Sequence, residues 1–173
     1  MSNPDSFDDY VNVVSNFPLL VLLFGYKWTT VFHCSWEKGQ KAFCNVATEE
    51  TFMMANGVTI SPDKKTVFVN DPLQSKVTAM TRDVVSGKLT KKSEIETTMV
   101  DNIEYDDEAN EIIMGNILPG GMTVLHQSGE SWVTRRVLKH NEEKLKQISA
   151  ASRLGYRIVL GSPFSEGILV CSI

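Results

Sequence analysis

The amino-acid sequence predicts an all-β fold of β-propeller blades, which form an incomplete propeller within a single domain, residues 1–173. Three observations lead to this prediction. A strand–turn–strand pattern repeats after about 45 residues, and a further apolar strand recurs at nearly the same interval. The composition, with 42% hydrophobic and 22% charged residues, is that of a globular chain with a packed core.

The repeated hairpin occurs first at residues 58–69 and again at residues 103–114. Each copy has an apolar strand, a polar turn (SPDKK in the first, DDEAN in the second) and a second apolar strand. Asp, Asn, Ser and Pro favour such turns because their side chains or rings stabilise turn conformations locally. The segment GYRIVLGS, residues 155–162, is similar to the second strand and predicts a third copy of it.

A further strand follows each hairpin. The four copies are TTVFHCS (29–35), KVTAMTR (76–82), MTVLHQS (122–128) and GILVCSI (167–173). Four short strands per unit, repeated at this interval, are typical of propeller blades, because each blade covers its faces only against its neighbours. A β-sandwich with coincidental spacing is the alternative.

The length of the chain predicts that blades are missing. The repeats account for roughly the last three to four blades of a propeller, whereas closed propellers have roughly four to eight. An unclosed row would leave one apolar face and one strand edge exposed. We therefore expect further blades on the N-terminal side, or a partner that takes their place.

The apolar run FPLLVLLFGY, residues 17–26, is the one segment that raises the question of a membrane span. It has about ten residues, whereas a spanning helix needs roughly 18 or more. It also lacks the basic first part and the cleavage site of a signal peptide. We expect a buried strand or a core helix here.

Charge and cysteine spacing exclude several classes of function. The net charge of −4 and the pI near 5.4 give no basic surface for nucleic acid. Cys34, Cys44 and Cys171 lack the C-x-x-C spacing of zinc and redox sites. Because their number is odd, at least one thiol is unpaired or has its partner outside this chain.

The repeat also aligns polar residues at the start of two inner strands. A shift of about 45 residues places Asn56 over Asp101 and Gly57 over Asn102. The inner strands of a propeller begin at the central channel, so these amide and carboxylate oxygens are expected to converge there. Such oxygens suit Ca²⁺, whereas zinc prefers His or Cys. In the alternative interpretation, Asn-Gly and Asp-Asn serve only as turn and strand-end residues.

Two segments, ANGVTISPDKKTVFV (55–69) and VDNIEYDDEANEIIMGN (100–116), resemble the serum paraoxonase/arylesterase family. They match that family's A-N-G-I-x-I-S-P-D and V-D-N-I motifs, and the closing GILVCSI is similar to its C-terminal strand. The resemblance covers most of the chain and is strongest over residues 53–126. It corresponds to the C-terminal half of a typical member.

The resemblance implies a six-bladed propeller that hydrolyses lactones and aryl esters with a calcium ion in its central channel. It implies Asn56, Asp101 and Asn102 as calcium ligands, with Asn3 as a fourth ligand. Asp101 and Asn102 are thereby also assigned to the catalytic centre. The calcium would polarise the carbonyl oxygen of the substrate while a general base activates water.

The same resemblance implies a small-molecule ester or lactone as the binding partner. Met54 and Leu73 match residues that hold the acyl or aryl group, although both could equally be core residues. Secretion, or residence in the lumen of the endoplasmic reticulum, and association of the full-length relatives with membranes or lipoproteins are further implications.

This sequence departs from the family pattern in its histidines and ligands. The family's glutamate ligand and its histidine pair have no counterpart here. His33 and His126 lie on the recurring strand, away from the channel, and do not match that pair. Asn116 and Ile117 stand where a pocket histidine follows V-D-N-I.

The resemblance also implies a disulfide between Cys171 and a cysteine outside this chain. Without that partner, Cys171 would be free, or paired with Cys34 or Cys44.

Three hypotheses of function follow. The first is part of a calcium-dependent arylesterase or lactonase with little activity on its own. The second is a non-catalytic relative that acts as a binding or chaperone-type protein in membrane-protein assembly. The third is an unrelated repeat scaffold in which Asn56 and Asp101 serve only turns.

Overall fold

The computed structural model of the chain describes residues 6–12, 25–118, 120–138, 145 and 147–172. All regular elements of these residues are β-strands, and they form four antiparallel sheets. We call these sheets blades 1 to 4 in chain order. The described residues include no helix that could cross a membrane.

Each blade consists of strands that are neighbours in the sequence. Blade 1 contains β1 (Ser6–Asn12), β2 (Val31–Glu37) and β3 (Phe43–Val46). Blade 2 contains β4 (Val58–Ile60), β5 (Thr66–Asp71), β6 (Lys76–Arg82) and β7 (Leu89–Glu96). Blade 3 contains β8 (Met99–Asp106), β9 (Glu111–Leu118), β10 (Gly121–Ser128) and β11 (Ser131–Leu138). Blade 4 contains β12 (Ala150–Leu154), β13 (Arg157–Gly161) and β14 (Ile168–Ser172).

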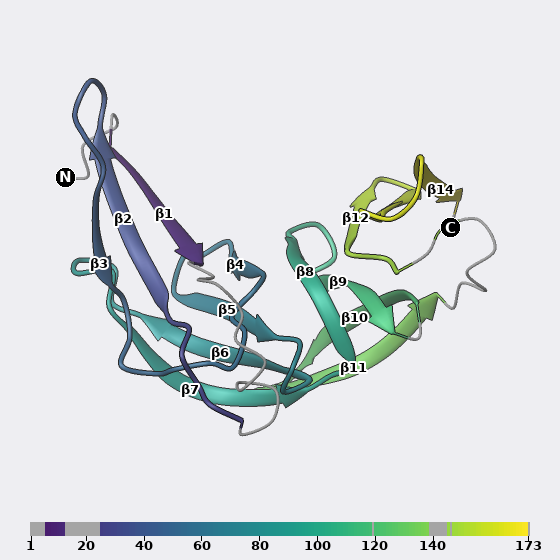
Figure 1. Cartoon of the computed structure of the whole chain (residues 1–173), viewed down its shortest axis with the longest axis horizontal. Coiled ribbons are helices and arrows are strands. Elements are labelled where there is room, and N and C mark those ends of the chain that lie inside the picture. Colours follow the sequence, from purple (N-terminus) through teal and green to yellow (C-terminus); the bar gives the residue numbers. More distant parts are fainter. Residues whose placement is uncertain (1–5, 13–24, 119, 139–144, 146, 173) are drawn as a thin grey trace.

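The four blades follow one another in an open, curved row, with blades 1 and 4 at its two ends (Figure 1). The predicted all-β fold of incomplete propeller blades is therefore confirmed. The repeated hairpins are β4–β5 and β8–β9, and the copy predicted near residue 155 is β13.

The core of the protein lies between the blades. β5 and β9 are buried along nearly their whole length because a neighbouring blade covers each face of their sheets. Successive side chains of a strand point to opposite faces. Accordingly Val67 and Val69 pack towards blade 1, whereas Phe68 packs towards blade 3. Three apolar clusters fill the three junctions between blades.

Both predicted hairpin turns are present. In the first, the Ser61 N–H donates to the carbonyl of Thr66 (2.9 Å), and the Ser61 hydroxyl donates to Asp63 (2.6 Å). In the second, Asn110 adopts a positive φ of 53°, which Asn tolerates better than most residues. Local turn chemistry thus sets the hairpins, as the sequence pattern indicated.

Four strands per blade were expected, but the position of the fourth strand in blades 2 and 3 was not predicted. β7 has only Leu89 and Ile95 buried, and its other positions are polar and exposed, so it lacks an apolar alternation. Charged residues on such an outer strand protect the sheet edge from pairing with another chain. The recurring strand of the sequence is therefore the third of four strands in these blades, with one more strand outside it.

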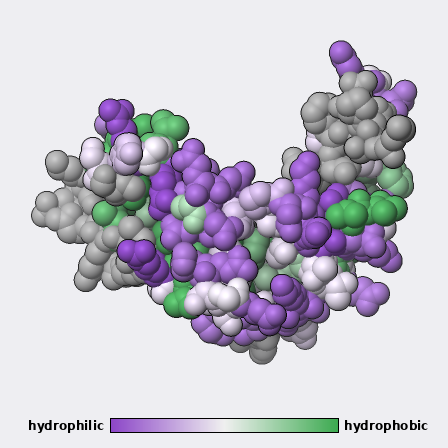
Figure 2. Space-filling view, turned by 180° about the vertical axis from the view of Figure 1, so that it is seen from behind, coloured by the Kyte–Doolittle hydropathy of each residue, from purple (hydrophilic) through white to green (hydrophobic). Residues whose placement is uncertain are grey.

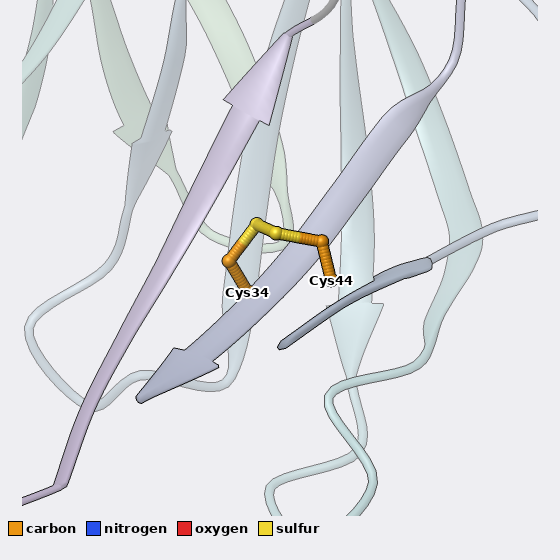
Figure 3. The surroundings of a disulfide bond; sticks show 2 residues. All are labelled: Cys34 and Cys44. Atoms are coloured by element: carbon orange, nitrogen blue, oxygen red, sulfur yellow. A yellow bond between two sulfur atoms is a disulfide. The ribbon is translucent and has the colours of Figure 1, made fainter. Parts of the chain in front are cut away.

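The cysteines pair in a way that the sequence did not indicate. Cys34 of β2 and Cys44 of β3 lie directly opposite each other, with a Cα–Cα distance of 4.1 Å, and form a disulfide (Figure 3). Cys171 is a free thiol in β14, partly covered by the cluster between blades 3 and 4. Of the two alternatives for Cys171 within this chain, the free thiol is the one observed.

Both end blades expose apolar side chains. Phe43 and Val46 of blade 1 are 66% and 54% exposed, and Ile168 and Val170 of blade 4 are 69% and 49% exposed. Figure 2 shows hydrophobic side chains near both ends of the row and mainly hydrophilic ones between them. The exposed blade face and edge that an open row entails are therefore present. Most of the apolar run at 17–26 lies outside the described residues.

We predict that Gly115→Ala destabilises the protein by about 1–3 kcal/mol, the usual cost of overpacking. A Cβ at Gly115 would lie 2.7 Å from the carbonyl carbon of Ser149 and 2.8 Å from the nitrogen of Ala150, both backbone atoms of the next blade. Urea denaturation followed by circular dichroism measures the effect. Gly167→Ala is the matched control, since nothing lies within 4 Å of its Cβ. Equal unfolding midpoints for the two variants would contradict the prediction.

Candidate functional site

The structure brings Asn56 and Asp101 into direct contact, although they are 45 residues apart. Asn56 lies just before β4 and Asp101 lies in the first part of β8, which are the first strands of blades 2 and 3. The side-chain amide of Asn56 donates a hydrogen bond to Oδ1 of Asp101. Equivalent positions of two neighbouring blades thus place an amide and a carboxylate side by side.

A third residue, Asn70 at the end of β5, holds the two strands in this arrangement. Its fully buried side chain accepts a hydrogen bond from the N–H of Gly57. It also donates to the carbonyl of Val100 (2.9 Å) and to the carbonyl of Asp101 (2.5 Å). One amide therefore binds backbone groups on both sides of the junction between blades 2 and 3.

The approach of the two blades is so close that it requires glycine at position 57. A Cβ there would lie 2.8 Å from the nitrogen of Ile103 and 3.0 Å from the carbonyl oxygen of Asp101. The Asn-Gly pair consequently has a packing role in addition to any turn preference.

The carboxylate of Asp101 is half-buried and has no ion-pair partner among the described residues. Burial raises the pKa of Asp101, because desolvation disfavours the charged form, while the hydrogen bond from Asn56 lowers it in part. A half-buried carboxylate without a counter-charge favours a bound cation.

Asn102 makes a different connection. Its backbone N–H and its side-chain amide both donate to the carbonyl of Ser149, at 2.9 and 3.0 Å. Asn102 thereby joins blade 3 to the start of blade 4. Its side-chain oxygen takes part in neither of these two hydrogen bonds. Asn3, the fourth predicted ligand, lies outside the described residues.

A buried carboxylate that was not predicted, Asp71, organises the segment before Asn56. Asp71 is 1% exposed and accepts hydrogen bonds from the N–H groups of Met53 (2.7 Å) and Met54 (3.2 Å). It also accepts bonds from the backbone N–H (3.2 Å) and the side chain (2.6 Å) of Gln74. Asp71 thus positions Met54, one of the two predicted substrate residues. The other predicted substrate residue, Leu73, lies in the turn that follows Asp71 and is, like Met54, partly buried.

Asn116, which stands where the family pattern has a histidine, is buried and serves the fold. Its side chain donates to the hydroxyl of Thr123 (2.8 Å) and accepts from the hydroxyl of Thr98 (3.3 Å). The histidines that the structure describes lie on other strands, His33 on β2 and His126 on β10.

The side-chain oxygens at this site are of the type that binds a hard cation. Asp101 offers a carboxylate and Asn56 an amide oxygen, and Ca²⁺ prefers such oxygens. Calcium takes roughly six to eight oxygens. The described residues contain no cluster of three or more His, Cys, Asp or Glu side chains that could hold a metal. These two side chains alone would not complete the oxygen shell that Ca²⁺ requires.

A family model described as Arylesterase matches residues 8–154. A crystal structure from Bacteroides uniformis, provisionally described as a 6-phosphogluconolactonase, matches 82% of this chain with a TM-score of 0.60 and 15% identity. This chain spans 43% of the length of that protein, and at such low identity the likeness shows a common fold. No match is found among curated proteins.

We predict that Asp71→Asn destabilises the protein by about 2 kcal/mol. An amide has one acceptor oxygen and cannot accept from Met53, Met54 and Gln74 at once, so buried donors lose their partner. Thermal or urea unfolding measures the change. Asp83→Asn is the matched control, because Asp83 accepts similar turn hydrogen bonds from Val85 and Ser86 but is exposed. Equal losses in both variants would show that burial of Asp71 is not the cause.

We also predict that Asn56→Ala raises the pKa of Asp101 further in calcium-free buffer, because it removes a donor to the carboxylate. Since the pKa of Asp101 is raised in the folded state, the metal-free protein is expected to lose stability as pH rises through that pKa. NMR titration of the carboxyl carbon of Asp101 in both proteins provides the measurement. An unchanged or lower pKa in the variant would contradict this role of Asn56.

Proposed function

Because the chain belongs to the arylesterase family, we propose that it forms part of a calcium-dependent hydrolase of aryl esters and lactones. The observation that carries this proposal is the contact between Asn56 and Asp101 at the start of neighbouring inner strands. It supports a shared site, because side chains that serve only their own turns have no need to meet across two blades.

We assign the calcium to the oxygens of Asp101 and Asn56, with the side-chain oxygen of Asn102 and with Asn3 as further ligands. The carboxylate of Asp101 accepts hydrogen bonds only, and the neighbouring amide of Asn56 directs its NH₂ group towards it. The same amide, turned round, offers an oxygen to a cation. When bound, calcium polarises the carbonyl oxygen of the substrate and stabilises the negative charge that develops on it.

The residues of this chain supply charge, orientation and an apolar surface. Asp101 contributes the negative charge that holds a cation, and Asn70 and Gly57 fix the two strands that present the oxygens. Preorganised groups of this kind need little rearrangement during a reaction. Met54, anchored through Asp71, and Leu73 are proposed to contact the acyl or aryl group.

We propose that this chain alone has little activity. One carboxylate at the described site gives limited calcium affinity, because affinity increases with the number of charged ligands. A general base is also required, yet His33 and His126 lie on β2 and β10 instead of on the inner strands. The chain spans 43% of its structural neighbour, so the remaining ligands and the base are assigned to further blades.

The Cys34–Cys44 disulfide supports a secreted or lumenal location, since disulfides persist in oxidising compartments. A second candidate function, a non-catalytic binding or chaperone-type protein, is favoured by one observation. The position of the pocket histidine is occupied by Asn116, whose side chain is engaged in structural hydrogen bonds.

We predict that CaCl₂ raises the melting temperature of the chain and that Asp101→Asn abolishes most of this rise. The amide retains the shape of the side chain but removes its negative charge. Differential scanning fluorimetry with CaCl₂ and with EDTA measures the shift. Asp107→Asn is the control, because Asp107 is an exposed carboxylate in the turn directly after β8, away from Asp101. An equal calcium response in both variants would exclude Asp101 as a ligand.

Activity is tested separately, with phenyl acetate and an aliphatic lactone as substrates. In a chain that contains the further blades, calcium-dependent turnover that is lost in the Asp101→Asn variant would support the hydrolase and exclude the non-catalytic alternative. Calcium binding without any turnover, in a chain that contains the further blades, would favour the non-catalytic alternative.

A further inference from the structure

A cleft lies between blades 2 and 3, at the opposite end of the strands from the candidate site. Asn56 precedes β4, whereas Ser61 and Asp63 of this cleft follow it; likewise Asp101 lies early in β8, whereas Asn110 follows its end. The cleft has a volume of about 400 Å³, which is within the range of small-ligand sites. It plays no part in the proposed hydrolysis.

Three aromatic side chains from both blades form one wall of the cleft. The ring centroids of Phe68 and Trp132 are 5.1 Å apart, and those of Tyr105 and Trp132 are 6.3 Å apart. Trp132 stands nearly perpendicular to both other rings, at 78° and 81°. Phe68 is buried, whereas Tyr105 and Trp132 are partly exposed, so two rings are accessible to a ligand.

Hydrogen bonds hold this wall in place. The Tyr105 hydroxyl donates to the side chain of Asn110 (2.5 Å), whose amide donates to the side chain of Gln127 (3.4 Å). The rings are thus fixed by their mutual contacts and by this chain of polar groups, which lowers the entropic cost of binding a ligand.

The charges at the cleft favour a cation. Asp63 and Glu130 line it, and Lys92 is its one positive lining residue, which leaves a negative excess. The Ser61 hydroxyl, the Lys65 N–H and, to a smaller extent, the charge of Lys65 lower the pKa of Asp63, so it stays ionised. Burial raises the pKa of Tyr105, as do the negative charges of Asp107 and of Asp63.

We propose that this cleft binds a small organic cation with a quaternary ammonium group, of the choline type. Such a group is attracted to aromatic rings by their quadrupoles and to Asp63 and Glu130 by charge. It also has a low cost of desolvation, because its charge is spread over methyl groups. Anions are disfavoured by the two carboxylates, and neutral ligands gain no charge attraction from them.

Titration of the full chain with choline, observed by NMR or calorimetry, tests the proposal. Saturable binding of choline is expected, with at least about 10-fold weaker binding of its neutral isostere, in which carbon replaces the quaternary nitrogen. Equal binding of both compounds, or no binding of choline, would overturn the proposal.

Variants locate the site. Asp63→Asn and Trp132→Leu are each expected to weaken choline binding by about 3- to 10-fold, and Lys92→Gln is expected to strengthen it. Asp83→Asn, in an exposed turn outside the cleft, is the control and should leave binding unchanged. Asp63 is exposed, so its variant keeps the test valid if Trp132→Leu fails to fold. Unchanged affinity in the folded Asp63→Asn and Lys92→Gln variants would refute this location.

Discussion

The buried side-chain amide of Asn70 is the interaction on which the candidate site depends. It binds an N–H of blade 2 and two carbonyls of blade 3, so all of its bonds span or brace one junction. A buried polar group left without a partner costs about 1–3 kcal/mol, which makes a shifted arrangement of the two strands unfavourable. Gly57 lets the first strands of blades 2 and 3 approach closely, and this approach brings Asn56 into contact with Asp101.

Much of the fold could be predicted because a blade repeats its pattern of apolar residues and turns. β5 and β9 are apolar on both faces, and their turns carry Asp and Asn, so the hairpins were evident in the sequence. The outer strand β7 was not, because its exposed positions are free to be polar and show no alternation. The pairing of Cys34 with Cys44 depends on the register of β2 and β3, which the sequence does not reveal.

The site was predictable only where the repeat itself marks it. Asn56 and Asp101 were found because they occupy equivalent positions in two blades, whereas Asn70 and Asp71 bind backbone groups that become neighbours only in the fold. A signal was nevertheless available, since both polar residues close a strand that is otherwise apolar and buried. Asn102 was predicted only as a ligand, but its side-chain amide also donates a hydrogen bond to the carbonyl of Ser149 and so joins blades 3 and 4.

The open row has a consequence for the order in which the molecule unfolds. Each blade is stabilised by its own strands and by its contacts with adjacent blades, as in a one-dimensional chain of coupled units. Among the described residues, blades 2 and 3 each have a neighbouring blade on both sides, whereas blades 1 and 4 each have one such neighbour and expose apolar side chains such as Phe43 and Ile168. Local opening should therefore start at the two ends. The inner pair, which carries Asn56 and Asp101, is the cooperative unit that opens last.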